Sequence, residues 1–362
     1  MTENNKAIKY IALPVQLIDD EEGVIIRRGV FQLKLDGADV KDVMNIIVSN
    51  TSFKAMLKSE IQEFFMDHLQ AQVGKLIDLL IEKNILINKE NAEENIGITG
   101  EKPIDIFHWN FNSSTKVVLN NLKNTNFVII GVNEISKSLV ESMQEAGIKK
   151  LTVVDDPLAR NTSLFDNDKL SEEKWQNTLP EPVNYESWGN DIEPASIDCM
   201  VVTSEHGGQD FVREWNEQCV EENVPCFPVV LKDLIGYIGP YVIPGESACF
   251  ECFRGRQNAH LDNPSMTRKI EKYAFEGQAV NGYHPIMPSI IGKYTAYELL
   301  KIYGKSYGNY EIGTLIRVNM NLPQTTTHKV LKLPRCPVCS NLAINGNEST
   351  LKSTFMPGHK QE

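Results

Sequence analysis

The sequence predicts an α/β protein in two parts, an N-terminal winged-helix module followed by a doubly wound, Rossmann-like domain with a four-cysteine metal site. Three observations predict this class. Strand-like runs precede helix-like runs within residues 1–88. A buried strand, a helix and a second buried strand follow one another over residues 126–155, which is the βαβ unit that opens a parallel sheet. Two C-x2-C pairs, at 249–252 and 336–339, place four thiols in the second part.

Length and composition fit a globular protein of two or three domains. The chain has 362 residues, of which 41% are hydrophobic and 23% charged. No run approaches the roughly 18 apolar residues of a membrane span, and residues 1–6 hold no apolar signal core, so we expect a cytoplasmic protein with no membrane partner. The net charge of −12 argues against nucleic acid as a partner, because broad binding to phosphates needs positive charge.

Three strand-like runs open the chain. Residues 10–18, 23–27 and 30–35 are rich in β-branched and aliphatic residues and are bounded by turn signals. An acidic turn at 19–23 separates the first two runs, and Arg28-Gly29 separates the second from the third. These runs predict a small antiparallel sheet.

Three helical patterns follow the strands. Asp39 can cap the first, whose apolar positions extend from Val40 to Val48. The second covers roughly residues 53–65, and the third carries apolar residues at i, i+3, i+4 spacing from Leu69 to Ile81. Residues 85–87 can close the unit as a strand. This order predicts a winged-helix module over residues 1–88.

The third helix indicates what the module binds. A DNA-recognition helix carries clustered Arg or Lys, whereas this one sets two lysines, at 75 and 83, against three acids. We therefore expect the module to bind a peptide, which would pair as an added strand with residues 30–35 and lie over the third helix. A purely structural lid is the alternative. The predicted peptide-binding residues are Arg27, Arg28, Val30, Phe31, Gln32, Leu33, Lys34, Leu35, Gln72, Lys75, Leu76 and Leu79.

The rest of the chain divides into a linker, a large domain and a tail. Residues 89–125 are polar and turn-rich and predict a linker. The domain is predicted over 126–345 and the tail over 346–362. Within the domain, strands are expected at 126–131, 151–155, 197–202, 226–231, 314–319 and 330–333, and helices at 135–146, 211–222 and 287–303.

The two cysteine pairs predict one structural zinc ion. Both sulfurs of a C-x2-C knuckle can face the same metal, and four thiolates complete a tetrahedral site with no position left for water. Residues 253–335 separate the pairs, so the ion would tie together two distant parts of one domain. Four free core thiols are the alternative. The predicted ligands are Cys249, Cys252, Cys336 and Cys339.

The second part resembles the ubiquitin-activating-type adenylyltransferases, ThiF and MoeB among them, over about residues 120–345. The resemblance is carried, in order along the chain, by the strand that ends at Gly131 and by the segments 147–155, 216–219, 225–230, 248–254 and 336–339. It implies a doubly wound fold with a tetracysteine zinc site, and in catalytic members an ATP pocket at the end of the first strand.

The chain departs from the family's pattern where ATP would bind. Catalytic members carry several glycines after the first strand, so that backbone N–H groups approach the phosphates. Here only Gly131 remains, and Glu134 would turn a carboxylate toward a triphosphate. Asp155 matches the family's ribose-binding acid, whereas Glu205 stands where an Asp-Asn pair is expected. We interpret these four residues as a degenerate nucleotide pocket, expect no ATP cofactor, and assign no catalytic residue.

A winged-helix module before such a degenerate domain resembles the leader-peptide-binding, ThiF-like partner proteins of azoline cyclodehydratases. That resemblance implies a non-catalytic subunit that binds the leader of a ribosomal precursor peptide, as in bacteriocin biosynthesis. It would present the precursor to a separate YcaO-type ATP-dependent cyclodehydratase. A homodimer remains open, since the family's catalytic members dimerise through this domain. The alternatives are an active adenylyltransferase acting on a peptide or carrier-protein carboxylate, and a winged-helix regulator.

Overall fold

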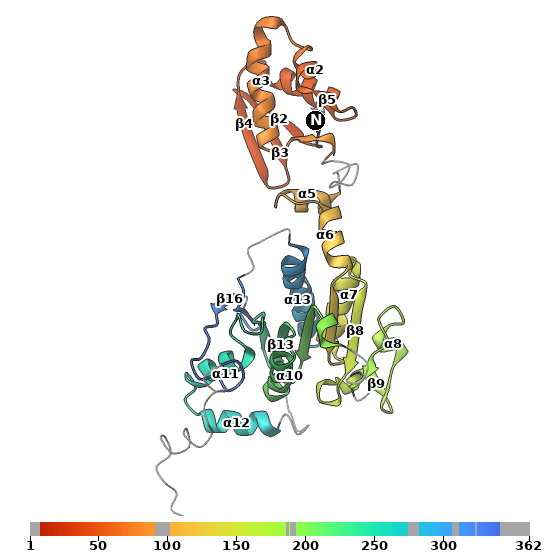
Figure 1. Ribbon diagram of the computed structural model, residues 1–362, viewed down its shortest axis with the longest axis vertical. Coiled ribbons are helices and arrows are strands. Elements are labelled where there is room, and N and C mark those ends of the chain that lie inside the picture. The colour runs from red at the N-terminus through yellow and green to blue at the C-terminus, as the bar shows by residue number, and fades with distance from the viewer. Residues whose placement is uncertain are drawn as a thin grey trace, which may run out of the picture. The chain divides into compact units, whose positions relative to one another are not determined.

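The computed structural model describes residues 8–90, 102–185, 188, 193–273, 282–305, 311–322 and 324–340. The chain forms two compact units. The N-terminal unit comprises Met1–Asn121 with Gly304–Gly308, and the C-terminal unit comprises Leu122–Tyr303 with Asn309–Glu362. In Figure 1 the first unit is coloured from red to yellow and the second from yellow to blue.

The N-terminal unit contains two three-stranded sheets. One is an antiparallel meander of β2 (Gln16–Asp20), β3 (Gly23–Arg28) and β4 (Phe31–Asp36). The other has β1 (Lys9–Ala12) between β5 (Met56–Leu57) and β6 (Leu86–Asn88). The sequence predicted one strand over residues 10–18, but Pro14 lies between β1 and β2. Because proline has no N–H to donate to a ladder, the strand breaks there and its halves join different sheets.

Three helices cover these sheets. They are α1 (Val40–Thr51), α2 (Lys58–Gln62) and α3 (Asp67–Glu82). The second helix is shorter than predicted, because Met56 and Leu57 pair with β1 instead of starting a helix. Apolar side chains from all the layers meet in one core, in which the following are fully buried: Val24, Ile26, Met44, Ile47, Ile61, Ile77 and Leu80.

Trp109 joins a later helix to the same unit. It ends α5 (Pro103–Trp109), which precedes α6 (Thr115–Lys123). Its indole N–H donates to the carbonyl oxygen of Asn84 at 3.0 Å. Its ring meets the ring of Phe31 edge-on, with centroids 5.7 Å apart, and the guanidinium of Arg28 lies 5.1 Å from its centroid. The chain that follows the gap at 91–101 therefore packs on β3 and β4.

The C-terminal unit is built on an eight-stranded sheet (Figure 1). Its order is β11-β8-β7-β12-β13-β14-β15-β16, parallel from β11 to β13 and antiparallel from β13 to β16. This confirms the predicted α/β class with a large, mostly parallel sheet. The strands are β7 (Asn126–Ile130), β8 (Lys150–Asp155), β11 (Val183–Asn184), β12 (Cys199–Ser204), β13 (Cys226–Lys232), β14 (Ile235–Ile238), β15 (Thr314–Asn319) and β16 (Gln324–Lys329), with a separate hairpin of β9 (Phe165–Asp166) and β10 (Lys169–Leu170).

Helices lie on both faces of this sheet. The chain passes from β7 to β8 on one side and from β12 to β13 on the other, so right-handed crossovers put α7 (Glu134–Glu145) and α10 (Gln209–Glu221) on opposite faces. A Cβ on Gly292 would lie 2.4 Å from the carbonyl oxygen of Ile135, so α13 packs closely on α7. The other α-helices within the described ranges are α8 (Glu172–Trp175), α11 (Phe250–Asn258), α12 (Pro264–Tyr273) and α13 (Ile286–Gly304), besides short 3-10 helices at Pro157–Ala159, Thr162–Leu164 and Pro194–Ser196.

The strand order reverses between β7 and β12, and that reversal positions the site. The carboxyl ends of these two strands form the topological switch point, where doubly wound sheets bind their ligands. β7, β12 and β13 are apolar and buried along nearly their whole length, as expected for central parallel strands.

Two antiparallel strands at the far edge differ from the prediction. β14 follows β13 after a tight turn in which Asp233 has a φ of 51°, and no strand was predicted there. The expected strand at 330–333 is not formed. Instead β16 pairs with β15, and the β-branched run Thr325–Thr327 favours it.

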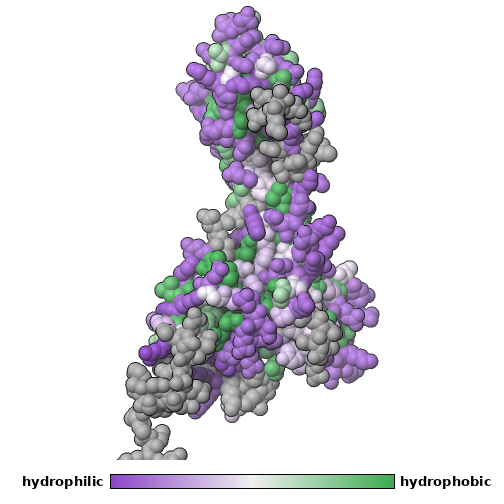
Figure 2. Space-filling model, in the orientation of Figure 1, coloured by the Kyte–Doolittle hydropathy of each residue, from purple (hydrophilic) through white to green (hydrophobic). Residues whose placement is uncertain are grey.

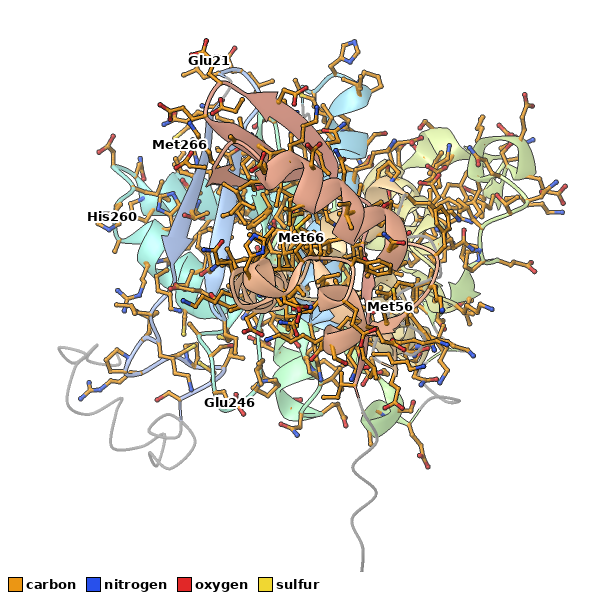
Figure 3. All side chains as sticks on the ribbon, turned by 90° about the horizontal axis from the view of Figure 1, so that it is seen from above. Glu21, Met56, Met66, Glu246, His260 and Met266 are labelled. Atoms are coloured by element: carbon orange, nitrogen blue, oxygen red, sulfur yellow. The ribbon has the colours of Figure 1, made fainter. Side chains whose placement is uncertain are left out.

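No helix within the described ranges is long and apolar enough to cross a bilayer. On the face drawn in Figure 2, hydrophilic residues cover most of the surface and apolar residues form separate groups. Single methionines illustrate the contrast in Figure 3, where Met66 at the start of α3 is 72% exposed and Met56 on β5 is 8% exposed.

Candidate functional sites

The four predicted metal ligands come together in the C-terminal unit. The Sγ atoms of Cys249 and Cys336 are 3.5 Å apart, and those of Cys252 and Cys339 are 3.4 Å apart. All four sulfurs lie within 4.8 Å of one another, and three of the cysteines are buried. Sulfurs about 2.3 Å from a tetrahedral zinc would be about 3.8 Å apart, so the cluster has the size of a metal site. These four cysteines can therefore hold a metal ion.

Local structure positions both knuckles. Cys249 caps the N-terminus of α11, and Cys252 lies in its first turn, so both sulfurs point to one side of the helix. The backbone N–H of Leu333 donates to Sγ of Cys252 at 3.3 Å. Arg256 holds the segment that leads to the second knuckle by donating to the carbonyl oxygens of Leu331 and Lys332. Such outer contacts orient metal ligands.

The turn after β7 is filled by its own side chains. Gly131 has a φ of 106°, and a Cβ there would lie 2.8–2.9 Å from atoms of Asn133, Ala159 and Thr203. Asn133 is fully buried and caps α7, because its side-chain oxygen accepts from the N–H of Ser136 at 3.0 Å. The serine hydroxyl in turn accepts from the N–H of Asn133 at 3.0 Å. A capping box thus holds the turn after β7, at positions where the resembled family carries glycines.

Glu205 lies against the N-terminus of α7. It is 1% exposed, and one carboxylate oxygen accepts from the backbone N–H of Ile135 at 3.0 Å. The other oxygen accepts from the side-chain amide of Asn161 at 2.8 Å and from the hydroxyl of Tyr283 at 3.1 Å. Burial raises the pKa of the Glu205 carboxyl, and these hydrogen bonds act in the opposite direction. Glu134, the other predicted acid here, is the half-buried first residue of α7.

Asp155, at the carboxyl end of β8, is engaged by a neighbouring arginine. Nε and one terminal nitrogen of Arg160 each donate to a different carboxylate oxygen at 2.7 Å. The Asp155 carboxylate raises the pKa of the Arg160 guanidinium through these hydrogen bonds. The guanidinium also lies 4.9 Å from the ring centroid of Phe165. The acid that matches the ribose site of the resembled family is therefore in a bidentate ion pair.

Sequence reasoning missed three residues of this pocket. Arg160 and Asn161 follow β8 directly, but they do not match the family's motif there. Tyr283 is 78 positions from Glu205, so no local pattern links the two. The signal that was available is the position of Arg160 and Asn161 just beyond an acid-ended parallel strand.

The predicted peptide-binding residues lie on β3, β4, α3 and the β3–β4 turn. β4 is an edge strand of its sheet, with Phe31, Leu33 and Leu35 half-buried and Gln32 and Lys34 exposed. On α3, Gln72 and Lys75 are exposed, whereas Leu76 and Leu79 are half-buried. Val30 in the turn is 84% exposed.

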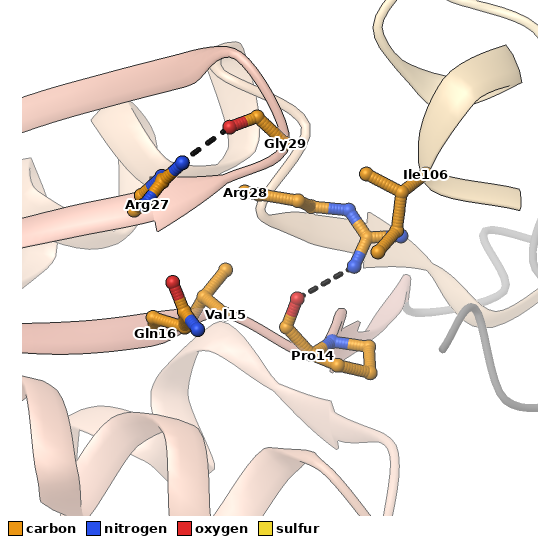
Figure 4. A pocket seen from close by; sticks show the side chains of 7 residues that line it. All are labelled: Pro14, Val15, Gln16, Arg27, Arg28, Gly29 and Ile106. Carbon is orange, nitrogen blue, oxygen red and sulfur yellow. Dashed lines mark hydrogen bonds between the residues drawn. The ribbon is translucent and has the colours of Figure 1, made fainter. Parts of the chain in front are cut away.

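The two predicted arginines line a separate cavity of about 370 Å³ (Figure 4). Arg28 is 3% exposed and donates to the carbonyl oxygen of Pro14 at 2.5 Å. Arg27 is exposed and its Nε donates to the carbonyl oxygen of Gly29 at 3.5 Å. Burial lowers the pKa of Arg28, and Asp105 acts against that shift. Arg28 thus stabilises the connection between β1 and β2. Val15, Gln16 and Ile106 complete the cavity wall.

Comparison of folds places the chain among known structures. No protein-family model matches the sequence, and no curated protein matches it. The crystal structure of E. coli MccB matches with a TM-score of 0.63 at 16% identity, covering 94% of this chain and 99% of MccB. MccB with AMPCPP and MccA matches with a TM-score of 0.62 at 16% identity, over 92% of this chain and all of MccB (100%).

Heterocyclases share the fold as well. The heterocyclase TruD matches with a TM-score of 0.59 at 16% identity, over 98% of this chain and 45% of TruD. A heterocyclase in complex with substrate and cofactor matches with a TM-score of 0.56 at 14% identity, over 92% of this chain and 40% of the other. The predicted resemblance is thereby confirmed at the level of structure: the chain has the ThiF-like fold of MccB and of part of TruD.

Proposed function

We propose that this chain is a peptide-binding and delivery subunit. Its N-terminal module binds the leader of a ribosomal precursor peptide, and the whole chain presents the precursor to a separate YcaO-type ATP-dependent cyclodehydratase that forms azolines. One observation carries the non-catalytic role. The N-terminus of α7 and the acid Asp155, which would hold ATP in catalytic members of the resembled family, are both bound by side chains of the chain itself.

The structural neighbours support a role in peptide modification. MccB has been solved with MccA, and one matching heterocyclase has been solved with substrate and cofactor. The match covers 45% of the length of TruD. We propose that a separate partner protein carries out the cyclisation.

The N-terminal module is proposed to be a winged helix that takes the leader as an added strand. β4 ends its sheet, so its outer edge can pair with an extended peptide through main-chain hydrogen bonds. The half-buried leucines of β4 and α3 offer apolar pockets for alternate side chains of the peptide. Arg27 and Lys75 are exposed and can steer an acidic leader, whereas Lys34 already pairs with Asp20 at 2.6 Å.

The metal is proposed to be zinc. Four thiolates in a buried cluster favour a soft divalent ion, and a closed tetrahedral set gives it a structural rather than a catalytic role. We also propose a cytoplasmic location, because reduced thiols persist there. A homodimer is proposed through α13, which keeps Ile286, Ile290 and Tyr297 exposed although the helix is largely apolar.

The test is leader binding by the intact protein. The probe is a fluorescein-labelled leader of the short, Cys/Ser/Thr-rich precursor that is expected to be encoded beside the gene, measured by fluorescence polarisation. Leu79→Glu should raise Kd at least about tenfold, because it puts a charge on the half-buried contact face of α3. Asn45→Glu adds the same charge at an exposed position of α1, outside the predicted peptide-binding residues, and should change Kd by less than about threefold.

Salt provides a second readout in the same assay. If exposed lysine and arginine side chains steer an acidic leader, Kd should rise between low and physiological salt, where the Debye length is about 8 Å. Equal Kd values for the two variants, or a leader that does not bind at all, would remove the support for the module as the peptide clamp.

One other function has an observation in its favour. The match covers 99% of MccB, and MccB has also been solved with ATP. An adenylyltransferase activity on a peptide or carrier-protein carboxylate is therefore the second candidate. Pyrophosphate exchange distinguishes it from peptide delivery.

A further inference from the structure

We propose that the pocket at the switch point of the sheet is closed by two contacts within the chain, a Glu205 carboxylate that takes the place of a phosphate and an Arg160 guanidinium that covers Asp155. This inference rests on the proposed delivery function, which it deepens by explaining how the ThiF-like fold is kept from binding nucleotide. It concerns residues that the peptide site and the metal site do not use.

The first contact satisfies the donors that an anion would need. The N-terminus of a helix leaves backbone N–H groups without intrahelical partners and carries partial positive charge. Glu205 accepts from Ile135 in the first turn of α7, and the backbone of Glu134 also faces it. Its second oxygen accepts from Asn161 and Tyr283. Both carboxylate oxygens are thus bound, as the oxygens of a phosphate would be.

Burial makes this contact hard to displace. Glu205 is 1% exposed, so an incoming phosphate would have to extract a buried carboxylate or share its site. Two anions in a partly desolvated pocket repel each other strongly. Glu134, half-buried on the same turn, adds a further negative charge.

Glu205 also joins segments that lie far apart in the chain. Ile135 lies in the first turn of α7, Asn161 follows β8, and Tyr283 precedes α13, while Glu205 itself follows β12. A single side chain therefore connects four segments at the carboxyl edge of the sheet. Removing the carboxylate should open the pocket and loosen these connections together.

The second contact closes the other half of the pocket. Arg160 binds both oxygens of Asp155, and its guanidinium stacks over Phe165. A ribose hydroxyl could bind Asp155 only after this bidentate pair had opened. Arg160 of the second contact and Asn161 of the first are adjacent in the chain, so one short segment takes part in both contacts.

In the first experiment, formate supplies the carboxylate that Glu205→Ala removes. Glu205→Ala in the full-length protein should lower Tm, and sodium formate should recover at least about half of the loss, whereas sodium chloride of equal ionic strength should not. Glu298→Ala is the matched control, because Glu298 is a 3% exposed carboxylate that pairs with Lys301 within α13, away from any helix N-terminus. Equal recovery by formate in both variants, or equal effects of formate and chloride on Glu205→Ala, would overturn the proposal.

The second experiment does not depend on the alanine variant folding. Arg160→Ala combined with Glu205→Gln keeps the buried volume of residue 205 but removes its charge and frees Asp155. Isothermal titration with AMP should show binding at least about tenfold tighter than to the wild type. Adding Asp155→Ala should abolish the gain. A double variant that binds AMP no better than the wild type contradicts the closed pocket.

The two proposals fail in different ways. Nucleotide binding with pyrophosphate exchange by the wild-type protein would reject the delivery function. A wild type without nucleotide binding whose variants show neither formate recovery nor AMP binding would leave delivery intact and reject only the two closing contacts.

Discussion

Cys249 and Cys336, 87 positions apart in the chain, hold their Sγ atoms 3.5 Å apart. Free thiols rarely gather in fours in a core, whereas a tetrahedral metal requires that arrangement. The contact also encloses α11, α12, α13, β15 and β16 along the chain, so a metal bound here would connect the two ends of this long segment.

The metal site is tested by substituting one ligand. Cys336→Ser should reduce zinc from about one ion per chain to well below that, and should lower the free energy of unfolding by about 3 kcal/mol or more, because metal binding contributes to folding. Zinc is measured by inductively coupled plasma mass spectrometry. Cys226→Ser is the control, since Cys226 is fully buried but lies outside the cluster, and it should keep its zinc. A wild-type protein without stoichiometric metal would refute the site.

Gly131 should not tolerate a side chain. Gly131→Ala should lower the free energy of unfolding by about 3 kcal/mol, because the residue has a φ of 106° and the new Cβ would clash with three neighbours. Gly245→Ala is matched in conformation, with a φ of 78°, but has nothing within 4 Å, and should cost about 1 kcal/mol. Urea denaturation measures both. Equal losses would show that packing around Gly131 is looser than described.

Glu205 should make stability depend on pH. Its pKa in the folded protein is raised above 4.5 by burial, so folding favours the protonated form. The wild type should therefore lose stability relative to Glu205→Gln as pH rises from 4.5 through the folded pKa, and the difference should then level off. Glutamine keeps the volume and does not titrate. Urea denaturation of both proteins across this pH range measures the difference in their free energies of unfolding. A difference that stays constant, or that changes in the opposite sense, would contradict a raised pKa of Glu205.

The chain should show no ATP–pyrophosphate exchange. The capping box of Asn133 and Ser136 and the buried Glu205 leave no open phosphate cradle after β7. The measurement is incorporation of labelled pyrophosphate into ATP, with and without precursor peptide. Robust exchange would favour the adenylyltransferase over peptide delivery.

Four strands of the parallel part of the sheet could be predicted, because buried parallel strands and their helices carry strong local patterns, whereas the short edge strand β11 was missed. β7, β8, β12 and β13 fall within a few residues of their expected positions. The metal ligands could be predicted equally well from the sequence, since a C-x2-C pair is a local motif. Tertiary pairing decided the rest. The predicted strand at 10–18 is interrupted at Pro14, and its halves belong to two sheets. Met56, which was predicted to be helical, pairs with β1 instead.

The closed pocket could not be predicted because its partners are distant in sequence. Glu205 meets Asn161 and Tyr283, which lie 44 and 78 positions away. The glycine loss and Glu134 indicated a damaged nucleotide site, but only the fold shows which side chains fill it. The departures from the family pattern locate the altered site, and the structure identifies the side chains that fill it.

The indole of Trp109 has a practical consequence for anyone who wishes to study the N-terminal unit alone. A chain cut at residue 90 would lose that indole, which leaves the Phe31 ring without its edge-on neighbour and exposes one side of the Arg28 guanidinium. Such a fragment would be prone to aggregation and to proteolysis near β3 and β4, whatever its affinity for a peptide. A stable fragment should extend through α5 to Asn121, where this continuous part of the N-terminal unit ends.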